Sequence, residues 1–256
     1  MTVAPDRIAW LQGSAFRCDP EPEAPERVYR LALLGPPGVG KGTQAELLCQ
    51  HLGTCHLSTG DVFRAAFTGA CTLSPALAAA QDTMRRGELV PDDVVILLVR
   101  ERSRCLRCRG GFLLDGFPRT VVQARALDAI LAEQGIALDG VISYHLPLDA
   151  IVARLGGRRI CPQCKAVYHV TSHPPRQEGI CDHCGTALVR REDDCPEAIR
   201  VRMQAYEADT CPLIDYYQAA GKLISIPASG TPEEILLRTL AALGVPEVQR
   251  SGTGRA

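Results

Sequence analysis

Two short stretches of the chain combine residue types that can do chemistry. The first is GPPGVGKGT, residues 35–43, in which glycines precede a lysine and a threonine. A glycine-rich turn that opens a helix presents backbone N–H groups to phosphate oxygens, and a lysine adds positive charge. The second stretch holds CPQC at 161–164 and CDHC at 181–184, paired cysteines typical of a zinc site. The sequence therefore predicts both phosphate binding and metal binding.

The phosphate-binding stretch is a variant of the spacing G-x-x-x-x-G-K-[ST]. Gly35 is the first glycine, Gly40 the second and Lys41 the lysine, while Gly42 takes the last position and Thr43 follows it. The stretch comes after the apolar run YRLALL and opens an amphipathic segment. This order of strand, loop and helix favours phosphate binding over an incidental glycine-rich turn.

The four cysteines of the second stretch are separated by two, sixteen and two residues. This spacing favours a tetrahedral site of four thiolates over two disulfides, and it leaves no open position for a reactive water. The metal is therefore expected to be structural, with no hydrolytic role. Three nearby imidazoles could replace one thiolate; they are His169, His173 and His183.

A further pair, Cys105 and Cys108, has no matching pair close in the sequence. It favours incidental thiols in a loop, with a redox or metal role left open. Cys49, Cys55 and Cys71 lie in apolar or helical contexts, where a buried small apolar side chain is expected. The length and the lack of a visible export signal favour reduced thiols over a disulfide framework.

Composition excludes several classes of protein. The 256 residues are 46% apolar and 22% charged, as in an ordinary globular protein, and the formal net charge is −1. No overall basic field favours nucleic acid or an anionic membrane. The longest strongly apolar run, VVILLV at 94–99, is far shorter than a membrane span of about 20 residues. The N-terminus lacks the pattern of a secretory signal, so a cytoplasmic location is expected.

Apolar strands alternate with amphipathic helices along the chain, which predicts an α/β fold with a parallel sheet flanked by helices. Strands are expected at 28–35, 110–116, 139–147 and 222–228. Helices are expected at 41–53, 120–135, 148–157 and 231–244. Residues 59–90 are expected to form consecutive helices without a strand, and residues 158–191 are rich in Pro, Gly, Cys and His. Both segments are predicted to leave the sheet domain as insertions.

Asp115 ends one of the apolar strands, beside the phosphate-binding loop. A carboxylate there can cap the next turn or hold a magnesium-bound water. The carboxyl end of a parallel strand is where ligands of open α/β sheets collect, so the magnesium role is favoured.

Four blocks, in this order, resemble adenylate kinases: GPPGVGKGTQA at 35–45, LSTGDVFRAA at 57–66, GFLLDGFPRTVVQA at 111–124 and GRRICPQC at 157–164. The resemblance covers Val28 to Leu243, and GFLLDGFPRT is highly specific for nucleoside monophosphate kinases. The proline- and glutamate-rich run DPEPEAPE predicts a flexible extension or linker at 1–27. The resemblance implies a kinase domain at 28–250. That domain would comprise a core (28–58, 91–157 and 192–250), an AMP-binding segment (59–90) and a mobile lid (158–191).

The resemblance also implies a reaction: magnesium-dependent transfer of a phosphoryl group from ATP to AMP, giving two ADP. Its partners would be ATP, AMP and ADP, without nucleic acid or membrane, and we expect a monomer. Some bacterial members have a zinc-bound lid, and the cysteine pairs fall at those positions. Two alternatives stay open: a GTP-using AMP kinase or other monophosphate kinase, and a zinc-ribbon protein that binds nucleic acid or a partner and uses nucleotide as a switch. The set of arginines in matching motifs and the absence of an overall basic charge argue against the zinc-ribbon alternative.

The resemblance assigns roles to individual residues. The catalytic set would be Lys41, Arg119, Arg158, Arg191, Arg202 and Asp115. The ATP-binding set would be Gly38, Val39, Gly40, Lys41, Gly42, Thr43, Arg158, Val167, Tyr168 and Pro232. The AMP-binding set would be Thr59, Arg64, Glu88, Leu89, Val90, Gly116, Phe117, Pro118, Arg119, Gln123, Arg191 and Arg202. The zinc ligands would be Cys161, Cys164, Cys181 and Cys184.

Two further expectations concern charge and specificity. Asp193 and Asp194 either pair with the phosphate-binding arginines when the lid closes or form an acidic surface turn. A glutamine such as Gln123 offers an adenine edge both a donor and an acceptor. The donor base would be held largely by main-chain groups, so the sequence indicates the preference for ATP over GTP as donor less directly.

Overall fold

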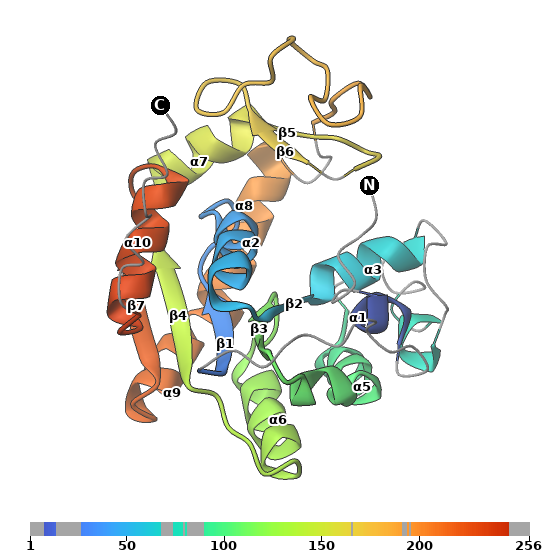
Figure 1. The fold of residues 1–256 in the computed structure, drawn as a ribbon, viewed down its shortest axis with the longest axis vertical. Coiled ribbons are helices and arrows are strands. Elements are labelled where there is room, and N and C mark those ends of the chain that lie inside the picture. The colour runs from blue at the N-terminus through green and yellow to red at the C-terminus, as the bar shows by residue number, and fades with distance from the viewer. Residues whose placement is uncertain are drawn as a thin grey trace, which may run out of the picture.

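A computed structural model describes residues 8–13, 27–67, 74–78, 80, 90–164, 166–190, 194 and 196–245. Five parallel strands form a central sheet in the order β2-β3-β1-β4-β7 (Figure 1). The strands are β1 (Tyr29–Leu34), β2 (Cys55–Ser58), β3 (Gly111–Asp115), β4 (Gly140–His145) and β7 (Leu223–Pro227). The predicted parallel α/β fold is confirmed.

Helices follow the strands as the alternation predicted. They are α2 (Lys41–Leu52), α3 (Thr59–Phe67), α5 (Asp92–Glu101), α6 (Val121–Ala132), α7 (Leu148–Gly157), α8 (Pro196–Ala205), α9 (Pro212–Ala219) and α10 (Pro232–Ala242). A 3-10 helix, η2 (Ser103–Arg107), and a π-helical turn, η4 (Tyr206–Thr210), complete the regular elements of the core. Strand β2 and helices α5, α8 and α9 are additions to the elements expected from sequence.

Alternate residues of the strands pack into two hydrophobic clusters, one on each face of the sheet. Leu31 and Leu33 of β1 belong to the cluster that includes residues of α2 and α10. Ala32 and Leu34 belong to the cluster that includes residues of α5, α6 and α9. Because side chains alternate along a strand, an uninterrupted apolar strand such as β1 is buried on both faces.

The register of the strands brings their carboxyl ends to one edge of the sheet. Asp115, the last residue of β3, lies opposite Leu33 of β1 and Ser58 of β2. The loop after β1, the turn after β3 and the start of α3 therefore open at the same edge. Neighbours of β1 on its two sides come from later parts of the chain, so this edge is the switch point at which open α/β sheets bind ligands.

A small antiparallel hairpin, β5 (Arg158–Ile160) and β6 (Val167–His169), lies beyond that edge (Figure 1). Isolated bridges join Ile160 to Val189 and Ile180 to Ala187, so the following loop folds back onto the hairpin. We call residues 158–190, as far as they are described, the lid.

The expected flexible extension at 1–27 is wrong for residues 8–13. There, α1 (Ile8–Gln12) places Trp10 in the core with 1% of its surface exposed. The rest of the extension up to residue 26 lies outside the described residues. Trp10 is the only tryptophan of the chain.

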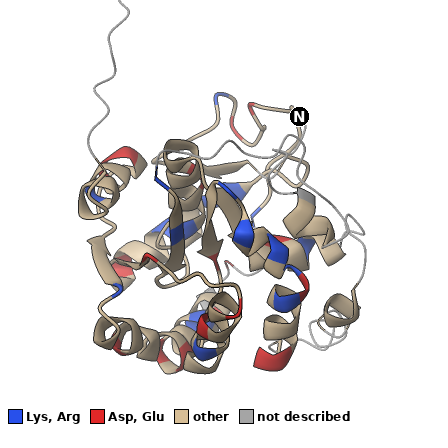
Figure 2. Ribbon diagram, turned by 60° about the horizontal axis from the view of Figure 1, so that its bottom comes forward, with Lys and Arg blue, Asp and Glu red and all other residues tan. Residues whose placement is uncertain are grey.

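Figure 2 shows acidic and basic residues interspersed along the helices of the described chain, in keeping with the near-neutral net charge. None of the described helices is long and apolar enough to cross a membrane.

Candidate active site and metal centre

The phosphate-binding loop lies between β1 and α2, and two of its glycines fit where no side chain could. Gly35 has a φ of 141°, and a Cβ there would lie 2.6 Å from the carbonyl oxygen of Tyr144. Gly38 has a φ of 80°, and a Cβ there would lie 2.5 Å from the Cγ of Leu155. The loop is thus held closely between β4 and α7, with its amides at the N-terminus of α2.

Lys41 is the first residue of α2 and lies against this loop. Its Nζ donates to the carbonyl oxygens of Gly35, at 2.6 Å, and Pro36, at 3.0 Å. Burial lowers the pKa of Lys41 to about 8; the Asp115 carboxylate opposes this shift, and the positive charges of Arg119, Arg202 and Arg158 add to it. The three predicted arginines and Asp115 are therefore close enough to Lys41 for their charges to act on it, and the four cations form one charge cluster. Gly42 and Thr43 are exposed in the same first helical turn.

Asp115 ends β3 at the centre of this charge cluster. His56 Nε2, from the neighbouring strand β2, lies 3.4 Å from Asp115 Oδ2. Burial raises the pKa of Asp115, but His56, Lys41 and Arg119 outweigh it and hold the pKa below its ordinary value. The carboxyl is therefore ionised at neutral pH, which a ligand to a magnesium-bound water requires. His56 was missed from sequence because strand β2 was not expected.

The turn after β3 carries Arg119. Gly116 has a φ of 83°, the Phe117–Pro118 peptide bond is cis, and Phe117 is fully buried. Arg119 Nε donates to the Gly116 carbonyl oxygen at 3.0 Å, while the side chain stays exposed at the edge of the sheet. This turn directs the guanidinium toward Asp115. Desolvation of the guanidinium by the surrounding protein and the charge of Arg64 lower the pKa of Arg119, and the charge of Asp115 opposes this shift.

Gln123 supports this turn from the first part of α6. Its Oε1 accepts from the Arg119 N–H at 2.8 Å, and its Nε2 donates to Asp92 Oδ1 at 2.7 Å. Thr120 Oγ1 donates to the other Asp92 oxygen at 2.7 Å. Gln123 is 4% exposed, and its amide oxygen and one of its N–H groups already have partners. Contact with an adenine edge stays a prediction, and it would use the second N–H of the amide.

The segment expected to bind AMP begins at the same edge. Thr59 opens α3, is 1% exposed and donates from Oγ1 to the Asp115 carbonyl oxygen at 3.5 Å. Arg64 forms an ion pair with Asp61 on the same helix. Val90 lies just before α5, whereas Glu88 and Leu89 lie outside the described residues.

A buried carboxylate organises the arginines of the lid side. Asp194, fully buried, accepts two hydrogen bonds from Arg158, from Nε at 2.7 Å and Nη2 at 2.6 Å. Arg202 Nη1 of α8 lies 3.6 Å from the same carboxylate, and Arg190 donates to the Asp194 carbonyl oxygen. The expected pairing of Asp194 with these arginines is confirmed. Arg191 and Asp193 lie outside the described residues.

Another arginine, which was not predicted from the sequence, contacts the phosphate-binding loop. Arg154 of α7 donates to the carbonyl oxygens of Val39, at 3.0 Å, and Ala228, at 2.8 Å. Near the same loop, Gln44 Nε2 donates to the Pro232 carbonyl oxygen at 2.8 Å. Both partners of Arg154 are main-chain oxygens, which leave no signal in the sequence.

The two residues expected near the donor base differ in exposure. Val167 is 52% exposed, but Tyr168 is 3% exposed and turns toward the cysteines. The Tyr168 hydroxyl accepts from the Asp182 N–H at 2.9 Å and lies 3.6 Å from Cys181 Sγ. A contact of Tyr168 with nucleotide would therefore involve its main chain.

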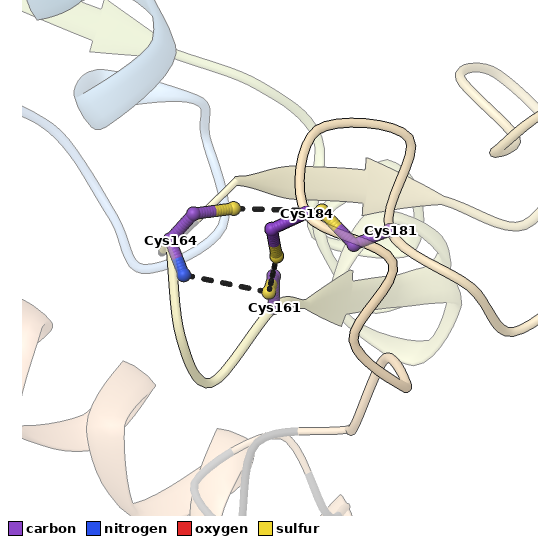
Figure 3. A group of neighbouring side chains, drawn as sticks. All are labelled: Cys161, Cys164, Cys181 and Cys184. Carbon is purple, nitrogen blue, oxygen red and sulfur yellow. Dashed lines mark hydrogen bonds between the residues drawn. The ribbon is translucent and has the colours of Figure 1, made fainter. Parts of the chain in front are cut away.

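The four lid cysteines converge from two turns (Figure 3). Their sulfurs all lie within 4.8 Å of one another, with Cys161 and Cys184 at 3.3 Å and Cys164 and Cys181 at 3.4 Å. Tetrahedral zinc, with Zn–S bonds of about 2.3 Å, sets sulfurs about 3.8 Å apart, so the four thiols fit the ion. Burial and neighbouring sulfurs raise the pKa of Cys164 to about 12, and a bound dication would remove this opposition to ionisation.

The other CxxC pair lies elsewhere. Cys108 Sγ contacts Cys55 Sγ of β2 at 3.0 Å. Within the described residues, the cluster with metal-ligand spacing consists of the lid cysteines, and Cys105 and Cys108 are not members of it.

Comparison with known proteins gives consistent results. The family model described as adenylate kinase matches residues 33–222. The chain is 49% identical over 214 residues to an adenylate kinase of Carboxydothermus hydrogenoformans, covering 84% of this chain and 99% of that protein. It is 50% identical over 214 residues to an adenylate kinase of Acidothermus cellulolyticus, covering 84% and 97%. It is 48% identical over 213 residues to one of Desulforamulus reducens, covering 83% and 99%.

The lowered pKa of Lys41 predicts a pH dependence of nucleoside triphosphate binding. Only the protonated amine attracts phosphate, and in the free protein it loses its proton as the pH rises through about 8. The affinity for ATP, measured calorimetrically, should therefore be about tenfold weaker at pH 9 than at pH 7.

Lys41→Arg is the matched control, because a guanidinium keeps its charge throughout this range. Its affinity for ATP, weaker overall, should change little between pH 7 and pH 9. Equal declines in both proteins would assign the pH dependence to another group.

The lid cluster predicts loss of metal on replacing Cys181 and Cys184 together by serine, since hydroxyls bind zinc poorly. Metal analysis should give about one zinc per unmodified chain and almost none for the double variant. The melting temperature should also fall, by about 5 °C or more, because metal binding and lid folding are coupled. Cys105→Ser with Cys108→Ser is the control and should keep its zinc. Zinc retained in the lid variant would contradict the assignment.

Proposed function

Because the chain belongs to the adenylate kinase family, we propose that the side chains at the carboxyl edge of its sheet bind ATP and AMP and stabilise the transferring phosphoryl group. The chain catalyses the reversible transfer of the terminal phosphoryl group of ATP to AMP, giving two ADP. The observation that carries the residue assignment is that Lys41 lies close enough to Asp115, Arg119, Arg158 and Arg202 for their charges to act on it. The proposed residue roles follow from that arrangement.

The donor triphosphate binds along the phosphate-binding loop. The backbone N–H groups of residues 38–43, at the N-terminus of α2, donate to its phosphate oxygens, and Lys41 exchanges its carbonyl partners for these oxygens. Arg154 supports this role by holding the Val39 carbonyl oxygen, which keeps the loop open for the ligand. The base lies toward Val167 and the main chain of Tyr168, with Pro232 on the opposite side.

The acceptor monophosphate binds beside α3. Arg64 and Arg119 hold its phosphate, and their proximity is supported by the effect of the Arg64 charge on Arg119. The base and ribose lie among Thr59, Val90, the Gly116–Pro118 turn and Gln123. Glu88 and Leu89 belong to the same proposed surface, although they lie outside the described residues.

Transfer itself requires neutralisation of the charge that spreads over the phosphoryl oxygens. Arg119, Arg158 and Arg202 are placed to supply it, and Arg191 is proposed to join them. Asp194 holds Arg158 and Arg202 near each other, which limits the ordering that these two side chains need in the site. Direct in-line transfer needs no covalent protein intermediate.

Magnesium bound with ATP would neutralise phosphate charge and order its oxygens. Asp115 is proposed to accept a hydrogen bond from a magnesium-bound water. Its support is the lowered pKa, which keeps it anionic, and its place beside Lys41. His56, at 3.4 Å, holds the carboxylate orientation.

Zinc in the lid is proposed to be structural. All four thiolates would bind it, which closes the coordination sphere and leaves the phosphate-binding arginines outside it. We further propose the division into core (28–58, 91–157 and 192–250), AMP-binding segment (59–90) and lid (158–191). The two nucleotide sites lie within one chain, which supports a monomer, and the required thiolates suit the reducing cytoplasm.

The alternatives are not favoured. A coupled assay distinguishes an adenylate kinase from a GTP-using enzyme and from a nucleic-acid-binding zinc ribbon. The assay uses ATP and GTP as donors and AMP, CMP, UMP and GMP as acceptors. Fastest turnover with ATP and AMP, and two ADP per cycle, is the expected result.

Replacing either Lys41 or Arg119 by alanine should reduce turnover of ATP and AMP at least about 100-fold, because each change removes a cation from the transition state. Circular dichroism should show the fold unchanged. Arg125→Ala, an exposed arginine on α6, is the control and should keep near-normal turnover. Turnover within tenfold of normal in both site variants would refute the assignment.

A further inference from the structure

Helix α1 lies ahead of the region that the family model matches, yet it is packed into the core. Trp10 shares a hydrophobic cluster with Leu57 of β2, Val62 of α3 and Leu98 of α5. Figure 1 shows α1 beside α3, on the side of the sheet edge where the acceptor segment begins. The helix therefore contacts α3 and packs in one cluster with residues of β2 and α5.

A hydrogen bond connects Trp10 to Ser58, the residue that directly precedes that segment. The indole Nε1–H donates to the Ser58 carbonyl oxygen at 2.9 Å, in a buried setting. Ser58 is itself the cap of α3, because its Oγ accepts from the Asp61 N–H at 3.2 Å. Trp10 thus holds the residue at which β2 passes into α3.

The other side of α1 is attached to the end of α5. Arg102 Nε donates to the Trp10 carbonyl oxygen at 2.7 Å, and its Nη1 lies 3.2 Å from the Glu101 carboxylate. Arg102 is 1% exposed, so α1 covers a guanidinium inside the protein. Buried charged groups require well-placed partners, and this contact therefore fixes α1 relative to α5.

The residue after Ser58 belongs to the proposed acceptor site. Thr59 donates to the Asp115 carbonyl oxygen at 3.5 Å, and its Oγ1 would lie 3.0 Å from a Cβ added at Gly116. A small displacement of Ser58 would change the position of Thr59 against both residues. It would also turn α3, which carries Arg64.

We infer that Trp10 is a positioning residue for the acceptor nucleotide: its indole N–H holds Ser58, and thereby sets the start of α3 against Asp115 and Gly116. The inference rests on the proposed acceptor role of Thr59 and Arg64. It gives residues 8–13, the described part of the segment before residue 27, a part in AMP binding, because their contacts include β2, α3 and the end of α5.

A tryptophan that only fills space would have a different effect. Loss of packing lowers the melting temperature but leaves the KM for AMP unchanged at temperatures well below the transition. Loss of a positioning contact raises the KM for AMP selectively. The two roles are therefore separated by kinetics with each nucleotide varied in turn.

The experiment compares the unmodified full chain with three variants, each of which carries one substitution. Trp10→Phe keeps an aromatic ring and removes the N–H, so the KM for AMP should rise about threefold with little change in melting temperature. Trp10→Ala should raise it about tenfold, while the KM for ATP stays within twofold in both variants. Leu11→Ala, which removes a partly buried neighbour in the same helix, should lower the melting temperature without changing the KM for AMP.

Tryptophan emission gives a second measurement without mutation. Trp10 is the only tryptophan, so AMP added to the unmodified chain should change its emission, and magnesium-ATP should change it less. An unchanged KM for AMP in both Trp10 variants would overturn the inference; if Trp10→Ala fails to fold, the Trp10→Phe value decides. Arg64→Ala in the same series tests the acceptor site itself, because an unchanged KM for AMP there would refute that site independently of Trp10.

Discussion

Convergence of positive charge at one edge of the sheet is the constraint on which the rest of the site depends. Lys41 meets Arg119, Arg158 and Arg202, while Asp115 is the carboxylate that acts on it. Burial, with a smaller contribution from repulsion by these arginines, lowers the pKa of Lys41 to about 8. A site with this excess of cations is completed by phosphate anions, and two nucleotides brought tail to tail supply them. Asp194 shows how the protein limits the repulsion, since it holds Arg158 and Arg202 on one buried carboxylate.

The fold delivers these groups from distant parts of the chain because parallel strands end at the same edge. β1 leads to the phosphate-binding loop, β3 to Asp115 and Arg119, and β2 to α3. The lid then adds Arg158 from a hairpin too small to bury much core, for which a metal cluster is a natural support. Tyr168 turns toward that cluster, which links the proposed base contact to the integrity of the lid.

Local pattern was sufficient to predict much of this arrangement. The alternation of apolar strands and amphipathic helices located most of the sheet, and the spacing of four cysteines located the cluster in the lid. Tertiary contacts explain what was missed. His56 lies on a four-residue strand too short to recognise, and Arg154 acts through main-chain oxygens that leave no sequence signal. Trp10 sits in an isolated helix of five residues beside a proline-rich stretch, where composition indicated flexibility and burial decided otherwise.

The most direct test is binding of a compound in which two adenosines are joined by five phosphates, because it places one polyphosphate across all the cations. Calorimetry and inhibition kinetics should show one molecule bound per chain, with competition against both ATP and AMP and an affinity well above that for either nucleotide. Competition against one nucleotide alone, or no binding at millimolar concentration, would contradict a single charged site shared by donor and acceptor.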